Sequence, residues 1–506
     1  MAVHRLTDSL IIDILIFNIS QRAVLPPPQN DARICIAQVC SRWRRLIVTT
    51  PEFWNSIAFY PVRFQNASNL LAIARMWIRR SKDTLLSLEF ISNFRLPMEQ
   101  PKFPSKGGSS SHSRIQDMCY GAGGFDTYSC LIFPHRKRIQ YLTCTIISER
   151  TILAFLKLPR GSFANIEYLN ICLINNISGT HSSFTLKELS RHDVTVFKSL
   201  PRLRRISFQI CNRLSPLQLN ISWFRLTQLE MGDNPISPKL CVMILNETSN
   251  HIVECFFQID HVRLKKKPAP RLSPVKKPFL ERLRLRSINP SNDTRIFKCM
   301  HLPALRGLWV EMQDTKLKGW KMDIYSTFLK HCCSPHLGYL HFSEFPTISC
   351  KPPFKPSSNQ TLARLFDMTK RLHTLVLPTG VQLHLSTLEG MVTGNLLPLL
   401  TSLKLTVSST CETFRLVDAV RRRNENAARV TCLPGTSSYV YPAKILTTPL
   451  PIMKIFIYIV ANGAMDEDHD YDELVKLCER CTRTHIQIID ISTLGVPTLR
   501  LDIKRY

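Results

Sequence analysis

The sequence predicts an α/β protein in which a small all-helical N-terminal domain precedes an irregular, horseshoe-like solenoid of strand-containing repeats. Three observations favour this fold class. A short apolar pattern recurs along most of the chain, and the first sixty residues carry helical periodicity instead. The length of 506 residues also exceeds what one compact domain usually holds.

The recurring pattern is apolar-x-x-apolar-x-apolar, and eleven copies occur along the chain. Many successive copies lie about 23 to 37 residues apart, the span of one strand with its returning helix or turn. Such units cannot bury their apolar faces alone, so neighbouring copies must stack into one core. The copies begin at Leu85, Ile139, Ile166, Leu203, Leu226, Ile252, Leu280, Leu305, Leu337, Leu372 and Leu400.

One copy, LTQLEMGDNPI, resembles the consensus of leucine-rich repeats, because Asn234 and Ile236 complete it. Few other copies keep the asparagine, so the chain resembles the irregular members of that family. We expect the array at 83–410, with C-terminal repeats or a capping unit at 411–506. Composition predicts a Pro, Ser and Gly-rich insertion at about 95–125 and a basic loop at about 263–278.

The N-terminal segment carries two helical patterns. In ICIAQVCSRWRRLIV, residues 34–48, apolar residues at steps of three and four predict one helix with an apolar stripe, and the arginines fall outside it. Residues 6–20, LTDSLIIDILIFNIS, predict a second helix with Thr7 or Asp8 as its N-cap. A domain with so little core usually depends on a partner.

These residues resemble the F-box, in the form common in mushroom-type fungi. The resemblance covers about residues 6–59, through L-x-x-x-L-I-x-x-I-L, a loop, V-C-S-R-W-R-R and T-P-x-x-W. It places an F-box at 4–60 and a connecting helix at 61–82. Thr7 stands where the family usually has a proline that touches the partner, and this difference predicts weaker binding.

The resemblance implies a substrate-recruiting subunit of a cullin RING (SCF-type) ubiquitin ligase. The F-box would bind the Skp-family adaptor and through it a cullin, while the repeats hold a protein substrate. Such a subunit holds the substrate close to the enzyme that transfers ubiquitin, and it needs no catalytic group, metal or cofactor of its own. The sequence alone does not divide the expected adaptor-binding residues between core and partner groove. They are Leu6, Leu10, Ile11, Ile14, Leu15, Val39, Cys40, Trp43 and Leu46.

The repeat pattern also suggests a substrate site. Residues flanking the second apolar position of each copy should point away from the core. Among them, Arg282, Arg284, Trp309, Tyr339 and His341 combine arginine forks, which suit carboxylate or phosphate, with rings that often anchor interfaces. We hypothesise an acidic or phosphorylated substrate segment there. The competing interpretation is that the arginines are merely solvated, since a one-residue slip of register would invert every face.

The charge balance leaves a different class of function open. Sixty-six Lys and Arg against 38 Asp and Glu give a net charge of +28, which attracts anionic partners. A basic scaffold that binds RNA or chromatin outside a ligase is the alternative. Its weakness is that aromatic residues are not interleaved with lysines along the sequence. The basic loop is consistent with a nuclear import signal or with a solvated insertion, so cytoplasm and nucleus both remain open.

Other classes find little support. The chain shows neither a signal peptide nor a membrane-spanning stretch, which predicts an intracellular protein with reduced thiols. CERCTRTH places Cys478, Cys481 and His485 near one another, but no second ligand pair stands nearby, so a buried helical face is favoured over a metal site. Phosphate-binding glycine loops and nucleophile elbows are absent from the sequence, and we expect no enzymatic activity.

Overall fold

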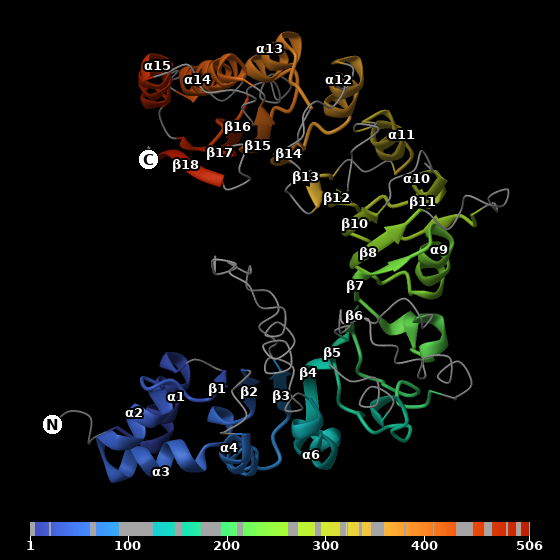
Figure 1. Ribbon diagram of the computed structural model, residues 1–506, viewed down its shortest axis with the longest axis vertical. Coiled ribbons are helices and arrows are strands. Elements are labelled where there is room, and N and C mark those ends of the chain that lie inside the picture. Colours follow the sequence, from blue (N-terminus) through green and yellow to red (C-terminus); the bar gives the residue numbers. More distant parts are fainter. Residues whose placement is uncertain are drawn as a thin grey trace, which may run out of the picture. The chain divides into compact units, whose positions relative to one another are not determined.

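The structure is a computed structural model of the chain. It describes residues 6–19, 22–60, 67–90, 125–146, 154–173, 194–209, 216–261, 272–288, 295–313, 320, 322–332, 336–345, 359–378, 381–407, 409–431, 449–459, 468–481, 484–491 and 497–504. The chain divides into two compact units, residues 1–234 and 235–506, which we treat separately. Figure 1 gives the element labels used below.

Unit 1 begins with three helices: α1 (Asp8–Asn18), α2 (Ala32–Val39) and α3 (Ser41–Thr49). The predicted cap of α1 is confirmed, because the Thr7 hydroxyl accepts the Leu10 N–H at 3.4 Å. The prediction of one helix over residues 34–48 was wrong. Cys40 is extended, with φ −158°, and its Sγ accepts the N–H of Trp43 as the cap of α3. A break of one residue does not change the spacing of the apolar residues in the sequence, so the pattern could not reveal it.

The all-helical expectation for residues 4–60 was also wrong. β1 (Ala23–Leu25) and β2 (Ser56–Phe59) lie within this segment and pair in parallel. β2 then pairs with β3 (Leu86–Phe90), so the sheet starts inside the segment that resembles an F-box. Strands of three and four residues are too short to show a period of two, although their side chains are largely buried.

The remaining strands of unit 1 continue this parallel sheet in chain order (Figure 1). They are β4 (Ile139–Ile146), β5 (Tyr168–Leu173), β6 (Arg205–Gln209) and β7 (Gln228–Ile236), the last of which crosses the unit boundary. Two helices of unit 1, α4 (Ala67–Arg80) and α6 (Phe125–His135), contact each other.

Unit 2 repeats the same construction. Its parallel strands are β8 (Glu254–Asp260), β10 (Arg282–Ile288), β12 (Gly307–Gln313), β13 (Tyr339–Phe345), β14 (Thr374–Val376), β15 (Ser402–Val407), β16 (Lys454–Ile459) and β17 (His485–Ile491). β18 (Pro497–Lys504) joins β17 antiparallel. A separate two-stranded sheet pairs β9 (Val275–Lys276) with β11 (Met300–His301).

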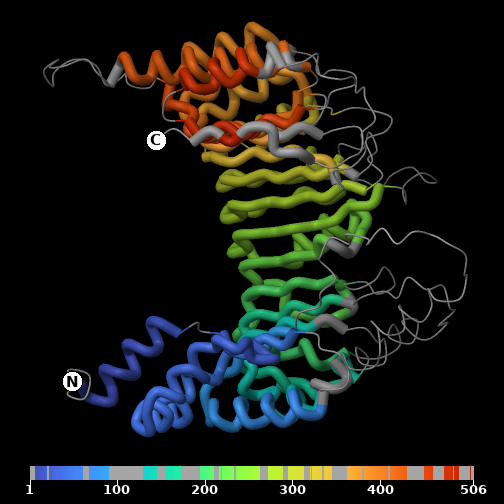
Figure 2. The backbone as a smooth tube through the Cα atoms, turned by 60° about the vertical axis from the view of Figure 1, so that its left-hand side comes forward, coloured from blue at the N-terminus to red at the C-terminus, as the bar shows by residue number. Residues whose placement is uncertain are grey.

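The helices of unit 2 line one side of its strands (Figures 1 and 2), and the described elements leave the opposite side uncovered by helix. We call that side the open face. The helices are α9 (Pro238–Glu247), α10 (Arg295–Cys299), α11 (Met322–Cys332), α12 (Asn359–Asp367), α13 (Leu385–Thr393), α14 (Thr410–Thr431) and α15 (Asp468–Glu479).

The predicted repeat register is confirmed. The second apolar residue of every copy is buried, and these residues align from strand to strand within each unit. In unit 2, for example, Leu283, Leu308 and Leu340 are paired neighbours, each with 0% exposure. Both units are therefore stacks of strand-containing repeats with a parallel sheet, an α/β solenoid architecture of the leucine-rich-repeat kind.

Two predicted surface segments have partial outcomes. The expected insertion at about 95–125 lies almost entirely outside the described residues, as does residue range 263–271 of the basic loop. The described end of that loop forms β9, and Lys277 is buried with its Nζ donating to the Thr248 carbonyl at 2.6 Å. Lys277 is thus not simply solvated, whereas its neighbour Lys276 is exposed. Within the described parts of the chain, no helix combines the length and apolarity needed to cross a membrane.

Candidate functional site

An exposed apolar row runs along α1. Leu10, Ile14 and Phe17, spaced four and three residues apart, are 46, 44 and 90% exposed. The residues between them, Ile11 and Leu15, are buried against the domain core. One face of this short helix therefore holds the fold together while the other presents large apolar groups to solvent.

The nine residues expected to bind an adaptor divide accordingly. Ile11, Leu15 and Leu46 belong to the core and are not available to a partner. Leu10, Ile14 and Val39 are exposed, and Leu6, Cys40 and Trp43 are half-buried. Three further exposed apolar residues, Ile16 and Phe17 on α1 and Ile34 on α2, were missed, although Phe17 continues the same helical spacing as Leu10 and Ile14.

The arginines beside the apolar stripe fasten the helices to one another. Arg42 and Arg45 on α3 both pair with Asp8 in the first turn of α1, at 2.8 and 3.3 Å. Arg44 donates from Nε to the Ala37 carbonyl on α2 at 2.9 Å. An acidic residue near a helix N-terminus is favourable in itself, and here it also receives two guanidinium groups.

The T-P-x-x-W segment, residues 50–54, packs against three of the helices. The Trp54 indole donates to the Ile47 carbonyl at 2.8 Å, and its ring lies 5.4 Å from that of Trp77 on α4. Arg33 is buried and donates from Nε to the Phe53 carbonyl at 2.8 Å. Burial lowers the pKa of Arg33, while Asp31 opposes that shift. These contacts join α2, α3 and α4 through residues 53 and 54.

A second candidate surface lies on the open face of unit 2, and we call it the arginine–aromatic cluster. Register brings together residues that are far apart in the sequence: Arg284 on β10 pairs with Trp309 on β12, which pairs with His341 on β13. The predicted outward direction of these side chains is confirmed, since Leu283 and Leu285 beside Arg284 are buried. The members of the cluster are Phe256, Arg282, Arg284, Arg286, Trp309, Glu311, Tyr339 and His341.

The arginines of the cluster have carboxylate partners within the protein, so the competing interpretation that they are merely solvated was wrong. Glu311 accepts from Arg284 Nε at 3.0 Å and from Arg286 Nε at 2.8 Å. Arg282 pairs with Glu254 at 3.2 Å. Burial acts to raise the pKa of Glu311, but hydrogen bonds from both arginines outweigh it, and the pKa is lowered. The sequence could not show this, because the partners are 25 and 27 residues apart.

Aromatic rings complete the cluster. Trp309 stacks on Tyr339 with ring centroids 4.4 Å apart, and the Tyr339 hydroxyl lies 3.1 Å from His341 Nδ1. The indole ring lies over Gly307, where an added Cβ would stand 2.5 Å from a ring carbon. On the other side, the Arg284 guanidinium lies 4.3 Å from the centroid of Phe256. Gly307 therefore lets the indole lie flat on the sheet.

Cations and rings alternate farther along the same face. Lys404 on β15 pairs in register with Phe456 on β16, and its Nζ lies 4.8 Å from the centroid of Tyr458. The interpretation that basic residues and aromatics are not interleaved was correct for the sequence and wrong for the folded surface. Strand pairing interleaves them across repeats.

The cluster makes a pH prediction. Burial lowers the pKa of His341 to about 4, with Lys404 and Arg284 also lowering it and Glu311 opposing them. Between pH 6.5 and 4 the unfolded chain therefore binds a proton that the folded chain rejects. We expect the free energy of unfolding to fall by about 2 kcal/mol as pH decreases through this window, after allowance for solvent screening.

Urea denaturation at several pH values, on wild type and His341→Gln, measures this contribution. The His341→Gln variant should lose that part of the acid dependence, whereas His336→Gln, at an exposed position, should keep it. Identical pH profiles for wild type and His341→Gln would contradict the assignment.

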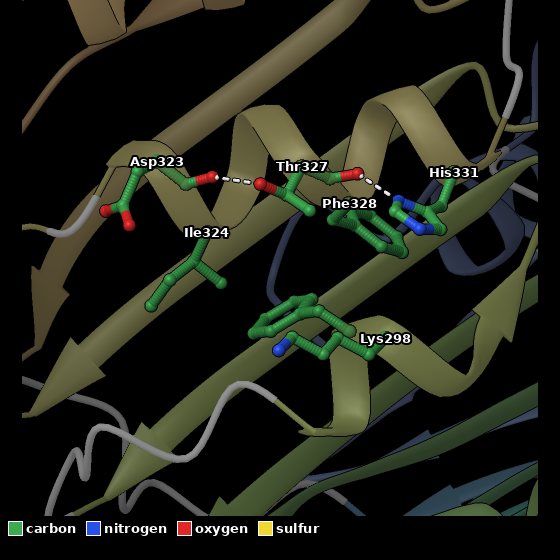
Figure 3. A pocket seen from close by; sticks show the side chains of 7 residues that line it. Lys298, Asp323, Ile324, Thr327, Phe328 and His331 are labelled. Carbon is green, nitrogen blue, oxygen red and sulfur yellow. Dashed lines mark hydrogen bonds between the residues drawn. The ribbon is translucent and has the colours of Figure 1, made fainter.

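A cavity of about 320 Å³ lies on the helix side of unit 2, between α10 and α11 (Figure 3). Phe297, Ile324 and Phe328 form its apolar wall. Two of its polar groups are engaged within α11, where the Thr327 hydroxyl donates to the Asp323 carbonyl at 2.8 Å and His331 Nδ1 lies 2.8 Å from the Thr327 carbonyl.

Both cysteines of the CERCTRTH segment lie in the core. Cys478 is buried on α15, as predicted, whereas Cys481 is buried beyond the end of that helix at Glu479, so the predicted helical face is confirmed only in part. Burial raises the pKa of both thiols to about 12. Cys481 directs its thiol to the Leu477 carbonyl, and His485 Nε2 lies 2.7 Å from Asp502. No cluster of three or more metal-ligating residues occurs among the residues that the structure describes.

Comparison with known proteins adds little to this geometry. No protein-family model matches the chain, and no curated protein matches it in sequence. Among solved structures, it is similar to the leucine-rich repeat-containing protein LegL7 from Legionella pneumophila, with 13% identity and a TM-score of 0.30. That alignment covers 67% of this chain and 97% of the other. So low a score carries no argument, and the fold assignment rests on the strands and registers above.

Proposed function

We propose that this protein is a substrate-recruiting subunit of a cullin RING ubiquitin ligase, with its N-terminal helices bound to a Skp-family adaptor. The observation that carries the proposal is the exposed apolar row of Leu10, Ile14 and Phe17. Scattered exposed apolar residues are ordinary on a protein surface. Three in helical register, on a helix whose opposite face is buried, are the arrangement that inserts into a partner's apolar groove.

The sequence resemblance supplies the identity of the partner. The F-box pattern of residues 6–59 coincides with the helical cluster that presents the row, and its arginines and tryptophan make the contacts that hold the cluster together. Thr7, which replaces the usual proline, serves as the N-cap of α1. The strand repeats that follow would hold the substrate, and transfer of ubiquitin would depend on proximity alone.

The test is adaptor binding by a double variant, Leu10→Glu/Ile14→Glu. Both positions are exposed, so the free protein tolerates the charges, but the complex would bury them in an apolar groove without partners. We expect affinity for purified adaptor to fall at least about 100-fold, measured by isothermal titration calorimetry. The unfolding midpoint should stay near that of wild type.

Leu385→Glu is the matched control, because Leu385 is 60% exposed on α13 in unit 2. It should bind adaptor like wild type. If the double variant binds adaptor as tightly as wild type does, the exposed row is not the contact and the ligase assignment fails.

The interleaved cations and rings of the open face favour a second candidate, binding of nucleic acid outside a ligase. Rings that stack on bases and cations that neutralise phosphates are what single-stranded nucleic acids require. The two functions differ in salt dependence: RNA affinity should fall steeply with salt, whereas adaptor binding through apolar residues should not.

A further inference from the structure

We infer that the open face between β10 and β16 binds an extended, acidic segment of a partner protein, with anionic groups at its two ends and an apolar side chain between them. This partner would be the substrate of the proposed ligase, and its ubiquitination rests on that proposed function. Binding itself can be measured on this chain alone.

The two ends of the site are set by the positions of the cations. Arg282 and Arg284 stand on β10, Lys404 stands on β15, and all three lie on outward rows of the open face. Four strand-to-strand steps separate β10 from β15, through β12, β13 and β14. At ~4.8 Å a step this is about 19 Å, which an extended peptide spans in about six residues.

The middle of the site suits an apolar side chain. The Trp309 ring lies flat over Gly307 and stacks on Tyr339, and both rings keep part of their surface exposed. His341 beside them is neutral at physiological pH, so it adds no charge to this platform. Tryptophan and tyrosine in such a setting are the residues that most often anchor an interface.

The arginines can hold a second anion despite their internal partners. A guanidinium has five N–H donors. Glu311 accepts hydrogen bonds from Nε and Nη2 of Arg284, and Glu254 forms an ion pair with Nη2 of Arg282. The remaining Nη1 groups lie on side chains that are 40% and 47% exposed. Arginines fixed in this way are preorganised, which lowers the ordering cost of binding.

Charge distinguishes a protein partner from a nucleic acid. The basic side chains of this face, Arg282, Arg284, Arg286, Lys404 and Lys454, are partly offset by two carboxylates, Glu254 and Glu311. A polynucleotide carries a phosphate on every nucleotide and would place several of them near Glu254 on β8 and Glu311 on β12. A peptide with only two anionic residues brings fewer negative charges to these carboxylates.

The experiment measures direct binding of fluorescein-labelled decapeptides to the purified full chain by anisotropy. One peptide carries two aspartates separated by five residues with a leucine midway, and a second carries phosphoserines in place of the aspartates. A third carries asparagines, and a fourth keeps both aspartates but places them side by side. An oligouridine of ten nucleotides serves as the nucleic-acid probe.

We expect the separated-acid peptides to bind about tenfold tighter than the asparagine and adjacent-acid peptides, and the better of the two identifies carboxylate or phosphate as the preferred group. Arg282→Gln and Lys404→Gln should each weaken binding about fivefold. Gly307→Ala should weaken it similarly, because the added methyl displaces the Trp309 ring without removing it. Lys298→Gln, which removes a positive charge from the helix side of the same unit, should have no effect.

Equal binding of all four peptides, tighter binding of oligouridine, or insensitivity to Arg282→Gln and Lys404→Gln would each overturn the inference. The assay contains no adaptor, so such a result leaves the ligase proposal standing. Conversely, the Leu10→Glu/Ile14→Glu variant should bind the peptides like wild type, and failure of adaptor binding would not alter that result.

Discussion

Replacing Arg423 with methionine is expected to lower the free energy of unfolding of unit 2 by about 3 to 5 kcal/mol. Arg423 is the largest fully buried side chain of the protein's described part, with 1% exposure. Its guanidinium donates to five backbone carbonyls from the loops around α13 and before β16, at 2.8 to 3.2 Å. They belong to Met391, Leu397, Pro398, Leu400 and Leu450.

Methionine would fill much of the volume but leave these buried acceptors without a donor, and each such group costs about 1 to 3 kcal/mol. Burial lowers the pKa of Arg423 to about 10, so the native side chain is charged at neutral pH and its charge is compensated only by carbonyl dipoles. Urea denaturation followed by circular dichroism measures the loss.

Arg422→Met is the matched control on the same helix. Arg422 makes a two-point ion pair with Glu389, but both side chains are about 40% exposed, so its loss should cost at most about 1 kcal/mol. Equal shifts of the unfolding midpoint for the two variants would mean that the carbonyl contacts of Arg423 contribute nothing beyond those of a surface pair.

The second large effect is expected from Glu311→Gln. The side chains of Glu311 and Arg286 are each only 10% exposed, so the amide would remove a charged acceptor from Arg284 and from the buried guanidinium of Arg286. We expect a loss of about 3 kcal/mol at pH 7, measured by urea denaturation. The folded pKa of Glu311 is lowered, so its contribution is present above the pKa of the unfolded chain and is lost as pH falls through the folded value.

Glu254→Gln provides the comparison, since its ion pair with Arg282 lies on the same face with both side chains at least 40% exposed. It should cost well under 1 kcal/mol. The Glu311→Gln variant should also lose part of the acid-induced destabilisation. Wild-type stability in Glu311→Gln would show that the two arginines find other acceptors.

The sequence predicted what depends on periodicity. Eleven apolar triplets located eleven strands, β3–β8, β10 and β12–β15, but not β16, β17 or β18. Their alternation gave the correct outward direction of Arg284, Trp309 and His341, because a strand that buries one face has only one workable register. It also placed Leu10 and Ile14 on the helix that exposes them. Features without a period, such as the break at Cys40 and the short strands β1 and β2, left no comparable pattern.

The sequence could not predict how the arginines are used. The net charge of +28 includes every arginine as if it were a free positive charge at the surface. In the structure Arg33, Arg138 and Arg423 donate to backbone carbonyls, while Arg286 pairs inside a buried cluster. Each partner is 20 or more residues distant along the chain and becomes a neighbour only after the repeats stack. Composition therefore overstates the general attraction of this surface for anions.

The reversal of direction at β18 has a consequence for aggregation. The strands from β8 to β17 pair in parallel, and only β18 runs antiparallel to its neighbour. At the edge of a sheet, unpaired main-chain groups remain open to pairing with another strand. The last parallel strand, β17, is rich in isoleucine: HIQIIDI. Because β18 folds back along it, residues 485–490 are paired on both sides rather than exposed as a template for intermolecular strand addition. The hairpin thus removes the isoleucine-rich strand from the edge of the sheet, which β18 forms instead.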